Sequence, residues 1–193
     1  MIQKKAEALL PTKFGEFRVI AFKADNNGHE YAALVKGNIR EKNNVLVRVH
    51  SSCLTGDVFA SLKCDCREQL IQSMKMIQKN GGVLVYDKEQ EGRGLGFSNK
   101  ILSYNLQENG FDTVEASHSL GFSEDMRTYN ASAEILKELG VRSVCLLTNN
   151  PDKIRQLEAF GIKMGKRMPL QTKPNRFNKK YLETKKKKLG HLL

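Results

Sequence analysis

The chain has 193 residues, 40% of them hydrophobic and only 4 of them proline, which is the composition of a globular domain rather than of a disordered or collagen-like chain. No run of 18 apolar residues occurs, and the first residues lack the apolar core of a secretory signal. We therefore expect a cytoplasmic protein without a membrane partner, folded as a single domain over residues 1–193.

The formal net charge of +11 would favour a nucleic-acid partner if it were spread over the surface. It is not, because 11 of the 32 basic residues but 1 of the 21 acidic residues lie between Lys163 and Lys188. Such a run is more often a solvated helix face or tail than a binding surface. We predict a basic C-terminal extension from about residue 163 and no nucleic-acid partner.

The first half of the chain has the pattern of β-structure. Segments 17–22 and 31–36 are rich in strand formers and flank Asp25-Asn26-Asn27-Gly28, a sequence typical of a turn, so they predict a hairpin. Segment 45–50 predicts a third strand, which ends at His50.

Helices and strands alternate in the second half. Apolar residues at helical spacing predict helices over residues 67–80, 99–109 and 131–139, and Asn150 before Pro151 predicts a further helix that ends before Gly161. Residues 83–86 and 144–147 are apolar runs typical of buried strands. The predicted fold class is α/β, with a mixed β-sheet core, flanking helices, a β-rich N-terminal part and the basic C-terminal extension.

Three of the four cysteines form a C-x10-C-x-C cluster of Cys53, Cys64 and Cys66. In a cytoplasmic protein such a cluster indicates a metal or catalysis rather than disulfides, and zinc suits three thiolates. The fourth ligand position is either open to water or closed by His50 or Cys145. We favour the open site, because Cys145 lies in an apolar run and a lone histidine at a strand end is more often a hydrogen-bonding residue.

An open zinc site acidifies the water that it binds, and zinc deaminases with thiolate ligands hydrate a ring carbon in this way. The cluster therefore favours hydrolytic attack on a ring carbon or an acyl centre. Thiolates acidify the water less than neutral histidines do, so neighbouring cations or hydrogen bonds must contribute.

Three further segments could bind an anion. Gly92, Gly94 and Gly96 surround Arg93 between a predicted strand and a predicted helix, although the same pattern also fits a plain turn. Segment 147–153 runs from a buried strand into a capped helix, which also fits ordinary capping. Segment 125–127 pairs an aspartate with an arginine, as surface ion pairs also do.

Several short motifs follow one another along the chain. They are Arg48-Val-His-Ser-Ser-Cys-Leu-Thr-Gly-Asp57, Lys63-Cys-Asp-Cys66, Gln90-Glu-Gly-Arg-Gly94, Asp112-Thr-Val-Glu-Ala116, Leu146-Leu-Thr-Asn-Asn-Pro151, Tyr181-Leu-Glu-Thr-Lys185 and Leu189-Gly-His-Leu192. In content, order and spacing they closely resemble the motifs of the GTP cyclohydrolase II family, and the resemblance covers essentially the whole chain.

The resemblance implies hydrolytic opening of the guanine imidazole ring of GTP. Water attacks carbon 8, formate and pyrophosphate leave, and the product is 2,5-diamino-6-(5-phospho-ribosylamino)pyrimidin-4(3H)-one, the first intermediate of riboflavin biosynthesis. The resemblance also implies one catalytic zinc ion on Cys53, Cys64 and Cys66, a magnesium ion with the triphosphate, and a homodimer.

The resemblance further implies the residues of the site. Asp125 corresponds to a proton acceptor, Arg127 to a nucleophile or a clamp at the α-phosphate, and Tyr104 to a tyrosine near the attacked ring. Glu91 and Gln69 are expected at the base. Arg48, Thr148 and Lys153 are expected at the phosphates. The full set of implied substrate-binding residues is Arg48, Val49, His50, Ser51, Ser52, Gln69, Glu91, Gly92, Arg93, Thr113, Thr148 and Lys153.

Two positions depart from the family pattern, since Ser52 stands in place of a glutamate and Arg67 in place of a glycine. Both changes make the site more positive, and they leave the alternative of a divergent member with an altered product or low activity.

Two other classes of function are further alternatives. A zinc nucleobase deaminase would carry H-x-E and P-C-x-x-C motifs, which the chain lacks. A zinc-stabilised RNA-binding protein would need stacking aromatics, which make up only 7% of the residues.

Overall fold

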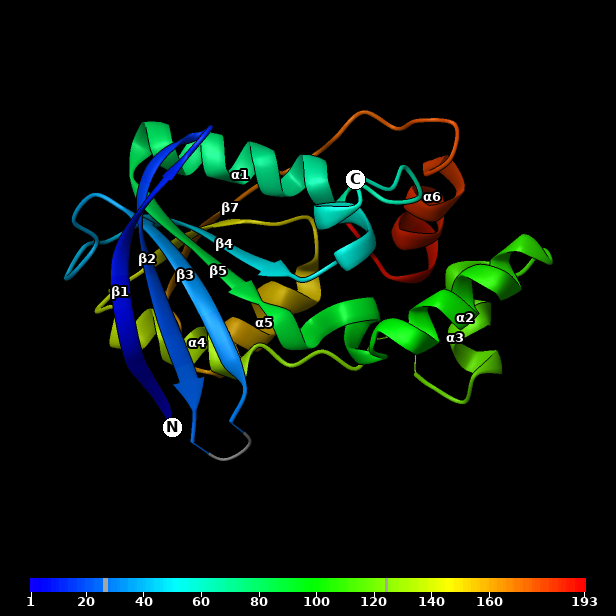
Figure 1. Cartoon of the computed structure of the whole chain (residues 1–193), viewed down its shortest axis with the longest axis horizontal. Helices are drawn as coiled ribbons and strands as arrows, with labels where there is room; N and C mark the ends of the chain where they lie inside the picture. Colours follow the sequence, from blue (N-terminus) through cyan, green and yellow to red (C-terminus); the bar gives the residue numbers. More distant parts are fainter. Residues whose placement is uncertain (26–27, 124) are drawn as a thin grey trace.

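A computed structural model describes residues 1–25, 28–123 and 125–193 of the chain. Its centre is a seven-stranded sheet with the order β1-β2-β3-β5-β4-β6-β7 (Figure 1). The strands are β1 Ile2–Thr12, β2 Gly15–Ala24, β3 Glu30–Lys36, β4 Val45–Ser51, β5 Gly82–Asp87, β6 Val144–Leu147 and β7 Met164–Met168. The helices are α1 Cys66–Asn80, α2 Phe97–Glu108, α3 Thr113–Ser119, α4 Asn130–Glu138, α5 Pro151–Ala159 and α6 Lys179–Lys188.

The sheet changes from antiparallel to parallel at β5. Strands β1, β2 and β3 pair antiparallel, and β5 pairs antiparallel with β3 but parallel with β4. Strand β4 then pairs parallel with β6, and β6 with β7. The carboxyl ends of β4, β5 and β6 therefore meet at one edge, where the segments that follow them converge.

Helices cover both faces of the sheet. On one face α1 packs Met74 and Ile77 against Phe17 and Leu84. On the other face α4 and α5 cover a larger core, to which the sheet contributes a row of buried valines. Helices α2, α3 and α6 lie beyond the edge of the sheet (Figure 1), and none of their described residues belongs to either core.

The α/β class and most of the predicted elements are confirmed. The predicted hairpin is β2 and β3, with Ala21 opposite Ala32, although Asn26 and Asn27 of its turn lie outside the described residues. The predicted strands before and after α1 are β4 and β5, and the four predicted helices are α1, α2, α4 and α5.

The structure adds elements that the sequence did not predict. Strand β1 escaped prediction because nearly all its residues are exposed and show no alternation, and α3 because it is short. A basic extension was predicted from about residue 163, yet β7 pairs with β6 as an edge strand of the sheet, and α6 buries Leu182 and Thr184. In the part of the chain that the structure describes, no helix is long and apolar enough to cross a membrane.

Candidate active site

Three thiols gather where the chain leaves β4 and enters α1. The sulfur atoms of Cys53, Cys64 and Cys66 all lie within 4.8 Å of one another, and those of Cys53 and Cys64 are 3.7 Å apart. Neither residue considered as a fourth ligand joins this group. Cys145 is buried within β6, and the Nε2 atom of His50 lies 3.0 Å from a carboxylate oxygen of Asp57. The described residues therefore present a three-thiol set, and this geometry favours the open site over a site closed by His50 or Cys145.

The surroundings of the cluster fit a bound metal ion. The backbone N–H of Gly56 donates to the Cys53 sulfur at 3.4 Å, and the Lys100 ammonium donates to it at 3.0 Å. A side chain at Gly56 would not fit, because an added Cβ would lie 2.8 Å from the Cys64 sulfur. Hydrogen bonds from Cys64 and Cys66, together with Lys100, lower the pKa of Cys53, whereas contact with Cys53 raises the pKa of Cys64 and of Cys66. Cys53 is therefore the thiol of the cluster that most readily forms the thiolate that zinc binds.

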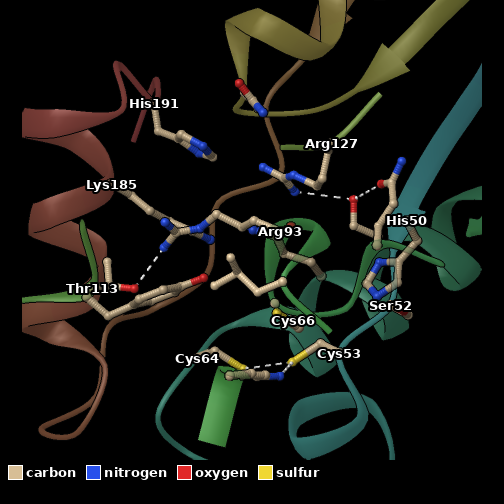
Figure 2. A pocket seen from close by; sticks show the side chains of 18 of the residues that line it. His50, Ser52, Cys53, Cys64, Cys66, Arg93, Thr113, Arg127, Lys185 and His191 are labelled. Atoms are coloured by element: carbon tan, nitrogen blue, oxygen red, sulfur yellow. Dashed lines mark hydrogen bonds between the residues drawn. The ribbon is translucent and has the colours of Figure 1, made fainter. Parts of the chain in front are cut away.

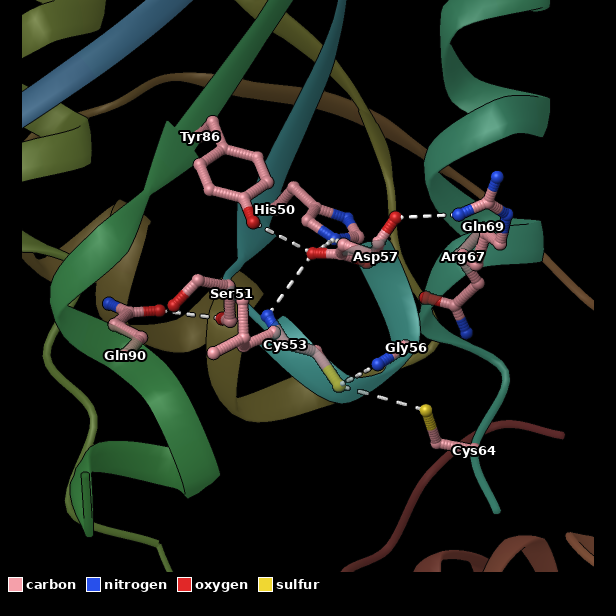
Figure 3. Close-up of polar contacts among 12 residues, drawn as sticks. His50, Ser51, Cys53, Gly56, Asp57, Cys64, Arg67, Gln69, Tyr86 and Gln90 are labelled. Atoms are coloured by element: carbon pink, nitrogen blue, oxygen red, sulfur yellow. Dashed lines mark hydrogen bonds and ion pairs between the residues drawn. The ribbon is translucent and has the colours of Figure 1, made fainter. Parts of the chain in front are cut away.

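Asp57 fixes the shape of the turn that carries Cys53 (Figure 3). Its carboxylate accepts hydrogen bonds from the backbone N–H of Cys53 at 3.1 Å and from the Tyr86 hydroxyl at 2.9 Å, and it pairs with His50. Tyr86 and His50 belong to β5 and β4, and their rings stack on each other. His50 therefore supports the cysteine turn, and burial lowers its imidazole pKa despite the Asp57 hydrogen bond.

The cluster opens onto a pocket at the carboxyl edge of the sheet, and the side chains that surround it include many cations (Figure 2). The lysines and arginines that line it are Arg48, Lys63, Arg93, Lys100, Arg127, Lys153 and Lys185. Among the described residues, no aspartate or glutamate lines it. A cavity of this charge suits a polyanion such as a phosphate chain.

Two buried cations form the floor of the pocket. The Arg48 guanidinium donates to the Leu147 carbonyl and to Gln69, but its buried Nε atom has no partner among the described residues. The Lys153 ammonium donates to the Val49 carbonyl at 2.7 Å. Burial, together with Arg48 and Arg127, lowers the pKa of Lys153 well below its usual value. An anion beside these groups would reverse that shift, because it favours the charged form of lysine.

Arg127 and Asp125 form an ion pair beside the pocket. The Nε atom of Arg127 donates to Asp125 at 2.8 Å, and another nitrogen of the guanidinium donates to the Ser51 hydroxyl at 3.2 Å. Burial alone would raise the pKa of Asp125, but Arg127 outweighs it and lowers that pKa. Asp125 is therefore ionised and orients Arg127.

A left-handed turn after β5 carries the glycine-rich motif. Gly92 and Arg93 have φ angles of 60° and 62°, a conformation that glycine adopts without strain. Arg93 is directed to the Thr113 hydroxyl at 2.9 Å. Glu91 pairs instead with Lys100 at 2.6 Å and accepts from the backbone N–H of Leu54.

The structure brings together most of the residues that the sequence singled out. Those lining the pocket are Arg48, His50, Ser51, Ser52, Cys53, Cys64, Cys66, Gln69, Gly92, Arg93, Tyr104, Thr113, Arg127, Thr148 and Lys153. Val49, Glu91 and Asp125 do not line it and act on residues that do. Tyr104 reaches Thr55 at 3.2 Å between their hydroxyl oxygens.

Sequence reasoning missed several residues of the pocket. Lys100 lies on a predicted helix, but nothing in its spacing indicates a thiolate partner. Tyr181, Lys185 and His191 come from the C-terminal segment, where a run of lysines indicates only charge. All three residues lie within motifs typical of the family, but the resemblance implies no role for them.

Known proteins match this chain in sequence over its full length. The riboflavin biosynthesis protein RibBA of Chlorobium phaeovibrioides is 50% identical over 194 residues, which cover 100% of this chain and 47% of that protein. RibBA of Aquifex aeolicus is 52% identical over 193 residues, which cover 100% of this chain and 48% of that protein. This chain thus spans about half the length of the curated relatives it matches.

One solved structure is also similar, that of RibBX, a two domain 3,4-dihydroxy-2-butanone 4-phosphate synthase from A. baumannii. It covers 86% of this chain and 40% of that chain, with 23% identity and a TM-score of 0.48. The model of the family described as GTP cyclohydrolase II matches residues 3–169, which include the whole cysteine cluster. On that match, this chain belongs to the GTP cyclohydrolase II family.

Proposed function

We propose that this chain hydrolyses the imidazole ring of GTP, with release of formate and pyrophosphate, as the first step of riboflavin biosynthesis. Family membership and the RibBA relatives support this reaction. One observation of the structure carries it furthest, namely three clustered thiols that open onto a pocket lined by seven lysines and arginines. One end of that pocket suits a metal and the rest suits a triphosphate.

The residues present fit zinc, and Cys53, Cys64 and Cys66 would hold it. A zinc ion on three protein ligands supplies a Lewis acid and an acidified water. Lys100 supports the cluster by holding the charge of Cys53, and the burial of Cys53 and Cys64 keeps bulk water away. Magnesium is proposed as the counter-ion of the triphosphate.

Different residues of the pocket would bind different parts of GTP. Arg48, Lys153 and Thr148 lie together at the carboxyl ends of β4 and β6, where they would bind phosphate oxygens. Arg127 would clamp the α-phosphate, because Tyr129 and Asp125 raise its guanidinium pKa despite burial and keep it charged. Gln69, held between Arg48 and Asp65, would face the base. Glu91 would also bind the base, once its carboxylate has broken the ion pair with Lys100.

The direct test is incubation of the chain with GTP, zinc and magnesium, with formate, pyrophosphate and the pyrimidine product measured together. We expect all three products in equal amounts. Release of ammonia without formate would instead identify a nucleobase deaminase. Absence of all these products, with salt-sensitive RNA binding, would identify an RNA-binding protein.

Replacement of one thiol tests the metal centre. We expect Cys64→Ser to lose bound zinc and to lower formate release by more than about 1,000-fold, because a hydroxyl is a poor zinc ligand. Metal analysis and the formate assay check this on the same sample. Cys145→Ser is the matched control, since Cys145 lies in β6 away from the cluster. Ring opening that survives in metal-free Cys64→Ser would contradict the proposal.

Identities of 50% and 52% over the whole chain do not favour the alternative of a divergent member with an altered product. In the structure the Ser52 hydroxyl donates to the Lys88 carbonyl at 3.0 Å, so the serine is accommodated at the rim of the pocket. An inactive chain rescued by Ser52→Glu would support the divergent alternative. A homodimer and a cytoplasmic location complete the proposal, as expected from the family.

A further inference from the structure

The C-terminal segment, residues 179–193, returns to the pocket instead of extending into solvent. Helix α6 ends at Lys188, and the chain turns back at Gly190, which has a φ of 64°. The backbone N–H of Leu192 then donates to the Asn149 carbonyl at 2.8 Å. Asn149 is itself fixed, because its amide exchanges two hydrogen bonds with the backbone of Leu170. The last residues are thus tied to the loop that follows β6.

This attachment brings three side chains into the pocket wall. Tyr181, Lys185 and His191 line the same cavity as Arg48 and Lys153. Figure 2 shows His191 and Lys185 on the side of the pocket opposite His50, with Arg93 between them and the remainder of the site. The segment therefore contributes a wall that no other described element supplies.

Each part of the lysine run has a different environment. The Lys185 ammonium is 3.4 Å from Asp65, the residue between two of the clustered cysteines, and lies over the Tyr181 ring. Lys188 pairs with Asp112 and Glu115 at the start of α3. These two contacts hold α6 in place from both sides. Lys186 and Lys187 are exposed, as expected for a solvated helix face.

We propose that the C-terminal segment forms one wall of the substrate pocket and that His191, held there by the turn that follows Lys185, binds the phosphate chain of the nucleotide. This inference rests on the proposed function, because it names a further residue for the same substrate.

The charge around His191 explains why a polyanion belongs there. Burial, followed by Lys185, Arg127, Lys153 and Arg93, lowers the pKa of the His191 imidazole to about 3. Four cations that face one neutral imidazole repel one another, and a phosphate chain between them would relieve that repulsion. The single N–H of the neutral imidazole would then donate to a phosphate oxygen.

The experiment measures binding to the zinc-loaded chain of two probes, guanosine and a GTP analogue with a methylene group between its α and β phosphorus atoms. We expect His191→Ala to weaken binding of the analogue by about 10- to 100-fold, the value of one hydrogen bond to a charged group, and to leave guanosine unchanged. Termination after Lys188 removes residues 189–193, including His191 and the backbone contact of Leu192 with Asn149, and should give at least the same loss.

Controls separate this inference from the proposed function. Lys187→Ala removes an exposed charge of the same helix and should bind both probes as the parent does, while zinc content and thermal unfolding show that each variant is folded. Parent-like binding of the analogue by both His191→Ala and the shortened chain would overturn the inference alone. Equal loss of guanosine and analogue would also overturn it. A parent chain that binds neither probe and releases no formate would overturn the proposed function.

Discussion

Strands β1, β2 and β3 contribute no residue to the pocket in the described part of the chain, whereas β4, β5 and β6 are each followed by a segment that lines it. The difference follows from strand direction. Antiparallel neighbours send successive loops to opposite edges, but parallel strands send all their carboxyl ends to one edge. The antiparallel half therefore contributes to the core without lining the site, whereas the parallel half lines the site and contributes to the same core. Substitutions confined to the antiparallel strands and to the site should have separable effects.

The largest expected effect in the antiparallel half comes from its core. Phe22 on β2 is 1% exposed and belongs to the main core. Phe22→Ala should lower the free energy of unfolding by about 3 to 4 kcal/mol, because it removes a buried aromatic ring and leaves a cavity. Denaturant unfolding checks this. Zinc bound per folded chain should stay unchanged. A loss of zinc at temperatures where the variant is folded would contradict the claim that the antiparallel strands act independently of the site.

The converse test lies in the parallel half. Gly56→Ala should weaken zinc binding by roughly 10- to 100-fold, because the new methyl group must displace the Cys64 sulfur from the cluster. Competition with a chromophoric chelator measures it. Gly37→Ala is the control, since Gly37 has a positive φ but open space around it, so backbone strain alone is tested there. Equal zinc affinity in the two variants would show that the contact at Gly56 is unimportant.

A pH-dependent test follows from Asp87 at the end of β5. Burial raises the pKa of this carboxyl to about 6 from an ordinary 3.8. The folded chain holds this proton more tightly than the unfolded chain does, so Asp87 costs stability that grows as the pH rises from about 4 to 6. Asp87→Asn should therefore stabilise the protein by about 1 to 2 kcal/mol at pH 7.5 and by almost nothing at pH 4. Thermal unfolding at the two pH values checks it, and a gain equal at both would refute it.

The smallest effect is expected at the outer edge of the sheet. Leu9 on β1 is 67% exposed, so Leu9→Lys should change the free energy of unfolding by less than about 0.5 kcal/mol. Denaturant unfolding of the variant beside the parent measures it. Formate release should equal that of the parent, and a large change in either quantity would mean that β1 has a role beyond completing the sheet.

Sequence patterns predicted the elements whose burial is periodic or continuous. Strand β6 is buried at every residue and β3 alternates, so both leave a clear signal. Strand β1 gave none, because its exposed residues follow no period. Helix α3 is too short to show an apolar period, although Asp112 and Glu115 form a capping box at its start.

The candidate site divides in the same way. Cys53, Cys64 and Cys66 lie within 14 residues of one another, so their spacing alone indicated a metal. His191 reaches the pocket because the backbone N–H of the next residue, Leu192, donates to the carbonyl of Asn149, which lies 43 residues earlier in the chain. No local sequence pattern predicts such a contact. Long-range contacts of this kind depend on the finished sheet.

The contacts of the Asp57 carboxylate bear on how the protein behaves when zinc is scarce. It ties the turn of Cys53 to two strands through His50 and Tyr86, and all of these contacts are made by protein groups other than the cysteine sulfur atoms. A small zinc finger, by contrast, unfolds when its ion leaves. Because protein groups hold this turn, we expect the sheet to stay folded when zinc is removed, and we expect the protein to regain activity when zinc is supplied again.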